Sequence, residues 1–466
     1  MKPYHRTGSR FAGAIGRPAS GFCCMMKGDE VEVKVEVEVE VEVERGVMVV
    51  VMSVMSLMMV MLAGFLGVVQ ASAGIQHIYG DLVHTRYTVD EGFEVRGPVI
   101  MDMDRLRENR VRLQAGDTLL TEALRHLEAH TGWLLRQDPP SVTDKPETRA
   151  PVTPNDYVSQ GLYWWPDPSK RDGLPYIRRD GQRNPAYDSL DFPRLGRLIS
   201  AVESLALAWY FTGNELYAEK ANHYLQVWFC APETRMHPRL TYSQGIPGRN
   251  LGRASGLIDT YRMPVLIDAV YLLREGGSWP AHMDQCLQLW FSDLLDWMLT
   301  HDHGREEAAA RNNHGTWYDA QVVSYAVFTG RAELAEGILR EIVPRRIRSQ
   351  VARSGRMPRE MRRASGLAYS VYNLQAFSIL VQYGRLFGLD LTEYRKWLSS
   401  GLPGAVAWLD REFERRPEGE HVRERRDWMF LRAELTGEAV EVTPGQVKEL
   451  VPIKFRDVLI LSSDIK

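Results

Sequence analysis

The sequence predicts an all-α fold built from antiparallel helical hairpins. Apolar residues recur at three- and four-residue steps, and strand-like runs are few. Thr-Gly pairs at 212–213 and 329–330 are typical helix ends, because glycine readily takes the left-handed conformation there. Hairpins of similar length in series indicate an α/α toroid or barrel. A superhelical repeat array would also fit, although no fixed period is visible in residue identity.

Helical periodicity begins at about residue 105. A first helical stretch is predicted over Leu106–Arg136, and a polar segment rich in proline and glycine follows it over 137–193. Helix pairs are then predicted, in order, as Leu195–Phe211 with Glu215–Phe229, Pro264–Arg274 with His282–Thr300, Thr316–Phe328 with Ala332–Ile342, and Leu367–Phe387 with Leu391–Leu409. In a toroid, the loops at one end line a groove, so we expect loops 137–193 and 231–255 to form its walls.

The N-terminal residues differ from this pattern. We expect residues 1–46 to be a disordered, low-complexity tail, because the valine–glutamate alternation over 31–44 has no turn or partner after it. Residues 47–69 carry no charge, and small residues follow at Ala71 and Ala73, which fits a signal peptide over 47–73. The apolar run is also long enough for a signal anchor. We therefore expect a secreted, extracellular or periplasmic protein, or a membrane-anchored one that faces outside.

We expect the toroid to occupy residues 74–409, followed by a C-terminal extension over 410–466 without an assigned role. The formal net charge of −3 gives no global basic field for nucleic acid, so an acidic partner must meet locally placed arginines. Only Cys230 and Cys286 lie in the body, with no metal-type spacing. They form either one disulfide or two free buried thiols.

Three adjacent aromatic residues, Tyr163, Trp164 and Trp165, lie in the proline-rich loop segment 161–169. Adjacent aromatics outside a regular element cannot all face one core. At least one should therefore be available to stack on a sugar face. The alternative is that they pin the loop to the barrel.

Asn313 and His314 stand at the start of a predicted helix, in the segment 311–319. Backbone N–H groups and the positive end of the helix dipole are therefore close to them. The amide can bind a carboxylate, and the imidazole can take or relay a proton near neutral pH. The alternative is that Asn312 or Asn313 is an N-cap and His314 a surface residue.

An arginine-rich segment, 345–363, holds eight arginines and one glutamate. Arginine binds carboxylates in a bidentate manner, so this segment provides the local positive charge that a polyanion needs. Arg363 is its last residue, and Tyr369 and Tyr372 follow at the start of an apolar helix. The alternative is a solvated basic face with two core tyrosines.

Together these segments resemble the alginate lyase superfamily of polysaccharide lyases. The resemblance covers about residues 105–400 and rests on Tyr163-Trp-Trp-Pro-Asp-Pro168, Asn312-Asn-His-Gly315, the segment 358–374 and the loop 236–253. It implies an incomplete α/α toroid that cleaves alginate or glucuronan. It implies an active site of Asn313, His314, Arg363 and Tyr369. We take as candidates for substrate binding Tyr163, Trp164, Trp165, Gln244, Arg253 and Tyr372. The sequence departs from the family pattern at Arg359, Met361 and Arg362, and the resemblance gives Arg253 no stated role.

In β-elimination, the enzyme removes the proton at C5 of a uronate and expels the O4 oxygen. Asn313 and Arg363 would stabilise the charge that develops on the C6 carboxylate. His314 and Tyr369 can supply the base and the acid. Alternatively, Tyr369 serves as both if the two protons lie on one face of the sugar, and a nearby arginine would favour the tyrosinate that the base step needs. We expect an anionic polysaccharide as partner, a monomer, and neither metal nor cofactor.

Three alternatives remain open from the sequence. A glycoside hydrolase on an α/α barrel would need two carboxylates across the scissile bond. The other two are a non-catalytic glycan-binding protein on a lyase scaffold and a helical scaffold for protein partners.

Overall fold

The computed structural model describes residues 25–27, 30–32, 79, 93–147, 151–276, 279–392, 399–417, 419–438 and 440. The chain divides into two units, residues 1–68 and 69–466. In the first unit, β1 (Met25–Lys27) pairs antiparallel with β2 (Glu30–Glu32). The start of the valine–glutamate run thus pairs with residues that precede it, and the expectation that residues 1–46 form a disordered tail stays a prediction. The rest of the tail and the run 47–73 lie outside the described residues.

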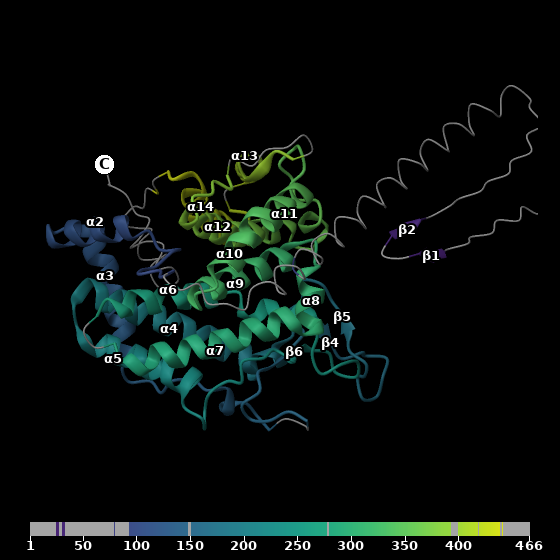
Figure 1. Cartoon of the computed structure of the whole chain (residues 1–466), viewed down its shortest axis with the longest axis horizontal. Coiled ribbons are helices and arrows are strands. Elements are labelled where there is room, and N and C mark those ends of the chain that lie inside the picture. The colour runs from purple at the N-terminus through teal and green to yellow at the C-terminus, as the bar shows by residue number, and fades with distance from the viewer. Residues whose placement is uncertain are drawn as a thin grey trace, which may run out of the picture. The chain divides into compact units, whose positions relative to one another are not determined.

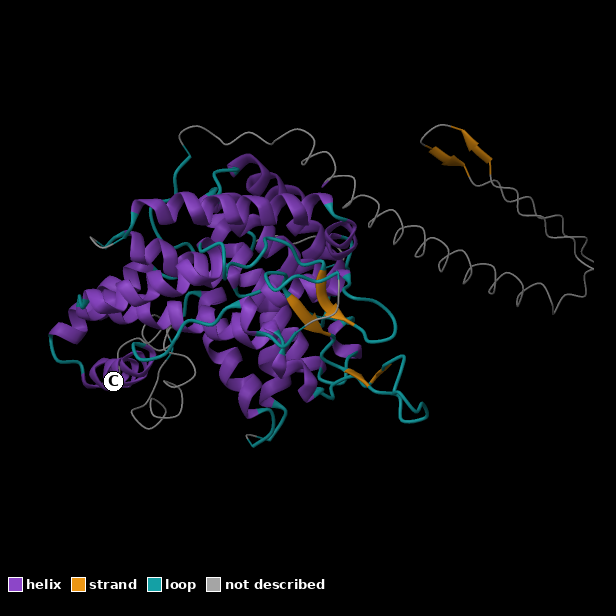
Figure 2. Ribbon diagram, turned by 90° about the horizontal axis from the view of Figure 1, so that it is seen from below, coloured by secondary structure: helices purple, strands orange, loops and turns teal. Residues whose placement is uncertain are grey.

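The second unit is predominantly helical (Figures 1 and 2). Its helices are α2 (Met103–Gln114), α3 (Thr118–Leu134), α4 (Asp191–Thr212), α5 (Glu215–Leu225), α6 (Met263–Arg274), α7 (Ala281–Thr300), α8 (Asp302–Ala308), α9 (Asn313–Phe328), α10 (Ala332–Gly337), α11 (Val343–Gln350), α12 (Gly366–Leu386), α13 (Gly401–Glu414) and α14 (Val422–Thr436). Two strand pairs lie in the loops. β3 (Val158–Gln160) runs parallel to β6 (Tyr242–Gly245), and β4 (Trp164–Trp165) runs antiparallel to β5 (Ile177–Arg178).

The helices form two layers. Helices α4, α6, α9, α12 and α14 pack side by side in that order, and α5, α7 and α10 pack against members of this row. A curved inner row of helices with an outer layer is the arrangement of an incomplete α/α toroid. The predicted all-α toroid is confirmed. None of the helices among the described residues is long and apolar enough to cross a bilayer.

The predicted helix ends at the Thr-Gly pairs are confirmed. Gly213 caps α4 in the left-handed conformation, with φ of 69°, and its N–H donates to the carbonyl of Trp209 at 2.7 Å. Gly330, with φ of 77°, follows the last turn of α9. In both places glycine reverses the chain at no steric cost.

Two predicted helices differ from the structure. The stretch 106–136 is two helices, because the Asp117 carboxylate accepts from the N–H groups of Leu119 and Leu120 and starts a new helix there. In the helix predicted over Leu391–Leu409, residues 391 and 392 are not helical, residues 393–398 lie outside the described part of the chain, and α13 covers Gly401–Glu414. At the expected start, the Asp390 carboxylate instead accepts from the N–H of Thr392 and holds a turn.

Helix α14 extends the helical body past residue 409, where the sequence suggested its end. Phe430 and Leu431 are buried, and the hydroxyl of Ser378 on α12 donates to Glu434 at 2.9 Å. The indole N–H of Trp428 donates to Asp410 on α13 at 2.9 Å. Amphipathic packing on α12 therefore makes α14 part of the inner row, and residues 441–466 lie outside the described part of the chain.

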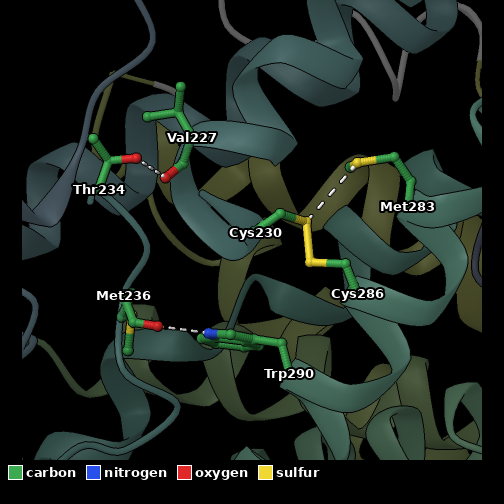
Figure 3. The surroundings of a disulfide bond; sticks show 7 residues. All are labelled: Val227, Cys230, Thr234, Met236, Met283, Cys286 and Trp290. Atoms are coloured by element: carbon green, nitrogen blue, oxygen red, sulfur yellow. Dashed lines mark hydrogen bonds between the residues drawn. A yellow bond between two sulfur atoms is a disulfide. The ribbon is translucent and has the colours of Figure 1, made fainter. Parts of the chain in front are cut away.

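A disulfide joins Cys230 and Cys286, which settles the choice that the sequence left open (Figure 3). It ties the π-helical turn η3 (Gln226–Cys230), at the end of α5, to α7. The loop that it closes spans 56 residues, and chain entropy gives such a link about 4 kcal/mol of stabilisation. Nearby, Trp290 on α7 donates to the carbonyl of Met236 at 2.7 Å, so α7 also holds the start of the loop 236–253.

Candidate active site

A cavity of about 1210 Å³ lies among the inner helices, at the end where α9 and α12 begin. Loops from 162–187 and 244–262 complete its wall. The four predicted catalytic residues line it together: Asn313, His314, Arg363 and Tyr369. Five of the six predicted substrate-binding residues also line it: Tyr163, Trp164, Gln244, Arg253 and Tyr372. Residues from separate motifs are thus brought into one hollow.

Asn313 is the first residue of α9 and is fully buried. Its backbone N–H and its side-chain Nδ2 both donate to the Glu360 carboxylate, at 2.7 and 2.6 Å. Asn312 occupies the N-cap position without a side-chain capping bond, so neither asparagine acts as a simple cap. Glu360 fixes the plane of the Asn313 amide, and one hydrogen of Nδ2 stays available for a ligand. Burial raises the pKa of Glu360.

His314 follows on the same turn, and its Nδ1 lies 2.5 Å from Oε1 of Glu307 on α8. The Glu307 side chain is only 5% exposed and that of His314 22%. A carboxylate against Nδ1 selects the tautomer with the proton on Nδ1, which leaves the lone pair of Nε2 for chemistry. Glu307 carried no signal in the sequence, because its link to His314 crosses a helix–helix corner rather than a helical turn.

Arg363 and Tyr369 form a second group with residues of the loop wall. Nη2 of Arg363 donates to the Tyr369 hydroxyl and to the Asp180 carboxylate, both at 2.8 Å. The guanidinium carbon lies 4.0 Å from the centroid of the Tyr369 ring. The hydroxyls of Tyr163 and Tyr369 are 2.8 Å apart. Sequence reasoning missed Asp180, which sits in an ordinary turn of the long polar loop.

The pKa of Tyr369 is raised rather than lowered, which corrects the expectation of a tyrosinate. Burial is the main cause and the hydrogen bond to Tyr163 the next, while Arg363 opposes both without overcoming them. Desolvation disfavours the charged phenolate more than one guanidinium favours it, because Arg363 also shares its charge with Asp180. Tyr369 therefore keeps its proton in this site.

A buried carboxyl group organises the loop wall. Nε2 of Gln244 donates to Asp259 at 2.8 Å, and Nη2 of Arg253 donates to Oε1 of Gln244 at 2.6 Å. Asp259 also accepts from Tyr157 and Ser159, and burial raises its pKa to about 6. These linked hydrogen bonds hold the Arg253 guanidinium at the cavity. The sequence alone had given Arg253 no structural role.

The three adjacent aromatics separate into two environments. Tyr163 and Trp164 line the cavity, and the guanidinium of Arg249 lies 4.9 Å from the Trp164 ring centroid. Trp165 is the one predicted substrate-binding residue outside the cavity lining. Its indole N–H donates to the carbonyl of Gln182 at 2.8 Å. Neighbouring residues of a strand point to opposite faces, so β4 can present only one of its two tryptophans to the cavity.

Tyr372 lies one helical turn after Tyr369 on α12 and belongs to an aromatic cluster. Its ring centroid is 5.3 Å from that of Tyr261 and 5.0 Å from that of Trp317. All three rings line the cavity. The cluster offers an apolar surface against which a sugar ring can pack. Among the described residues, no group of three or more His, Cys, Asp or Glu side chains could hold a metal ion.

Comparison with known proteins shows the family. The sequence model of the family described as "Alginate lyase" matches residues 141–418. The chain belongs to the alginate lyase family. An alginate lyase from Bacteroides ovatus is similar in structure, with 33% sequence identity and a TM-score of 0.72 over 79% of this chain and 100% of that one.

Two further similarities are more limited, one in sequence identity and the other in the length that is matched. A variant of alginate lyase A1-III complexed with a tetrasaccharide has 14% identity and a TM-score of 0.51, over 82% of this chain and 99% of that one, which supports the fold alone. Among curated proteins, an alginate lyase from Pseudomonas syringae pv. tomato is 32% identical over 108 residues. This match covers 23% of the chain and 28% of the relative's length.

Proposed function

We propose that this family member is a polysaccharide lyase that cleaves a uronic-acid polymer, alginate or glucuronan, by β-elimination. The observation that carries the proposal is the meeting of Asn313, His314, Arg363 and Tyr369 in one cavity of an α/α toroid. An amide, an imidazole, a guanidinium and a phenol are the groups that the reaction needs. The names of similar proteins support alginate as the first polymer to test.

Asn313 and Arg363 bind the C6 carboxylate of the uronate. Asn313 presents its Nδ2 at the first turn of α9, where the helix dipole also favours negative charge. Arg363 carries the positive charge, and Asp180 orients it from one edge. As the C5 proton leaves, charge moves onto the carboxylate, and donors that are already in place stabilise the enolate.

His314 is the base and Tyr369 the acid. The Glu307 carboxylate on Nδ1 leaves Nε2 of His314 able to take the C5 proton. Tyr369 enters the reaction protonated and gives its proton to O4 as the C4–O4 bond breaks and the C4–C5 double bond forms. The imidazolium and the phenolate then exchange a proton with water, which restores both groups for the next turnover.

The test is an absorbance assay with polymannuronate, polyguluronate and glucuronan. A lyase produces an unsaturated sugar that absorbs in the near ultraviolet. New reducing ends without this absorbance would identify the hydrolase alternative, and binding without depolymerisation would identify the glycan-binding alternative. Absence of turnover on all three polymers would contradict the proposal.

We also propose that the chain is secreted, after cleavage of a signal peptide over 47–73. The Cys230–Cys286 disulfide supports this, because such links persist in oxidising compartments. We further propose that the enzyme acts as a monomer on an anionic polysaccharide. Mass spectrometry of the secreted protein should find an N-terminus near residue 74 and both cysteines protected from alkylation before reduction. A retained apolar run would favour membrane anchoring instead.

A further inference from the structure

The connection between α8 and α9, residues 309–312, carries functional groups at both of its ends. Glu307 lies just before it, and Asn313 and His314 lie just after it. The distance between Glu307 and His314 therefore depends on the path of this short connection. Side chains from α11 and from the segment after it donate hydrogen bonds to the carbonyl groups of this connection.

Arg346 of α11 supplies the first of these side chains. It is 1% exposed, and its Nη1 donates to the carbonyl of Ala310 at 2.6 Å, while its Nη2 donates to that of Ala308 at 2.7 Å. Its remaining edge pairs with the fully buried Asp319 of α9. One guanidinium thus joins the end of α8, the connection and the body of α9. Planar, fixed donors suit arginine to such a task better than lysine.

Two further side chains continue the same pattern. Nη1 of Arg359 donates to the carbonyl of Arg311 at 3.0 Å, and Nε2 of Gln350 donates to that of Asn312 at 3.3 Å. Gly315 fits here as well, because a Cβ atom at this position would collide with the carbonyl of Ala310 and with Nη1 of Arg346. The carbonyls of residues 308, 310, 311 and 312 are thus held from α11 and the segment after it.

We propose that Arg346, with Gln350 and Arg359, forms a carbonyl clamp that positions Glu307 against His314 for catalysis. The inference rests on the proposed function. None of the three clamp residues lines the cavity, so they act through the connection and are positioning residues. A displacement of about 1 Å in a reacting group can lower a rate about 100-fold. The arginine-rich segment therefore serves two purposes: Arg363 faces the cavity, while Arg346 and Arg359 hold backbone.

The test is a double-mutant cycle of Arg346→Lys with Glu307→Gln, measured as kcat and KM on the best uronate polymer. Lysine keeps the charge beside Asp319 but cannot reproduce the fixed geometry of the clamp. We expect Arg346→Lys to lower kcat about 100-fold with little change in KM. In a Glu307→Gln background, the same change should cost much less, because the contact that it positions is already lost. Equal losses in both backgrounds would overturn the clamp.

Arg331→Lys is the matched control, because Arg331 is also nearly buried and paired with a carboxylate, Asp296, away from the cavity. Arg331→Lys should lower the thermal midpoint of unfolding, but its effect on kcat should be the same with and without Glu307→Gln. If Arg346→Lys does not fold, Arg359→Ala takes its place, since Arg359 is partly exposed. Amide hydrogen exchange over 309–315 should quicken in either clamp variant and not in the control. Unchanged exchange would overturn the clamp, whereas an inactive wild type contradicts the proposed function instead.

Discussion

Glu307 and Asp180 each contact a proposed catalytic residue, but from different surroundings. The Glu307 side chain is 5% exposed, comes from a helix and contacts His314. The Asp180 side chain is 30% exposed, comes from a loop and contacts Arg363. We call Asn313 and His314, with Glu360 and Glu307, the α9 half of the site. The α12 half comprises Arg363 and Tyr369, with Asp180 and Tyr163.

The difference indicates a division of tasks. In the α9 half, buried carboxylates fix an amide and an imidazole before substrate arrives, so little reorganisation is needed. In the α12 half, a phenol and a guanidinium meet a loop wall that the substrate must also contact. On the proposed function, a polymer has to enter and leave, and loops at the surface adjust more easily than packed helices. The effect of replacing a side chain should therefore depend on whether it belongs to the α9 half or to the α12 half of the site.

The largest effect should follow Tyr369→Phe, which removes the proposed acid and leaves the ring. We expect kcat to fall at least about 1000-fold, within the usual range for general acid catalysis. Polymer binding, measured by calorimetry, should persist. Tyr383→Phe, a buried tyrosine of the same helix whose hydroxyl contacts Ser324, is the control. If Tyr369→Phe keeps its activity, Tyr369 is not the acid, and the α12 half takes no direct part in the reaction.

The next largest effect should follow Glu307→Gln. The amide keeps the size of the side chain but no longer selects the tautomer with a lone pair on Nε2 of His314. We expect kcat to fall by about two to three orders of magnitude, because an orienting carboxylate of this kind acts on the protonation state rather than on binding. The measurement is kcat beside KM, with Glu306→Gln as a control on the neighbouring surface position. A loss confined to KM would contradict the assigned role.

The buried carboxyl of Asp259 in the loop wall should make the free energy of unfolding depend on pH. Burial raises the pKa of Asp259 to about 6 in the folded protein, above its ordinary value of 3.8. The folded state therefore holds this proton more tightly, and its contribution to the free energy of unfolding is lost as pH rises from about 4 to 6. The expected loss is about 3 kcal/mol. Urea unfolding of wild type and Asp259→Asn should diverge over this range, and parallel pH curves would contradict the assignment.

The smallest effect should follow Asp180→Asn. An ion pair of partly exposed groups is worth about 1 kcal/mol, so we expect kcat/KM to fall only about fivefold. Arg363 holds the pKa of Asp180 well below its usual range. Any stabilisation from the pair is therefore present above about pH 4 and lost as pH falls below it. Asp172→Asn, which changes an exposed turn carboxylate, is the control. A larger loss than in Glu307→Gln would reverse the comparison between the halves.

The sequence by itself determined the helices and the family. Helical periodicity and Thr-Gly ends located α4, α6, α7, α9 and α12 closely, because these signals are local. The motif residues Asn313, His314, Arg363 and Tyr369 could be named for the same reason. The sequence could not separate Trp164 from Trp165, because that depends on which face of a short strand meets the cavity.

Only the tertiary structure decided how the named residues are held. Glu307, Asp180, Asp259 and Arg346 act across helix corners and loops, where no periodicity links partners that are distant in sequence. The protonation of Tyr369 was likewise decided by burial, which outweighs the arginine visible in the sequence. Desolvation and long-range hydrogen bonds depend on what packs around a group, and packing exists only once the chain has folded.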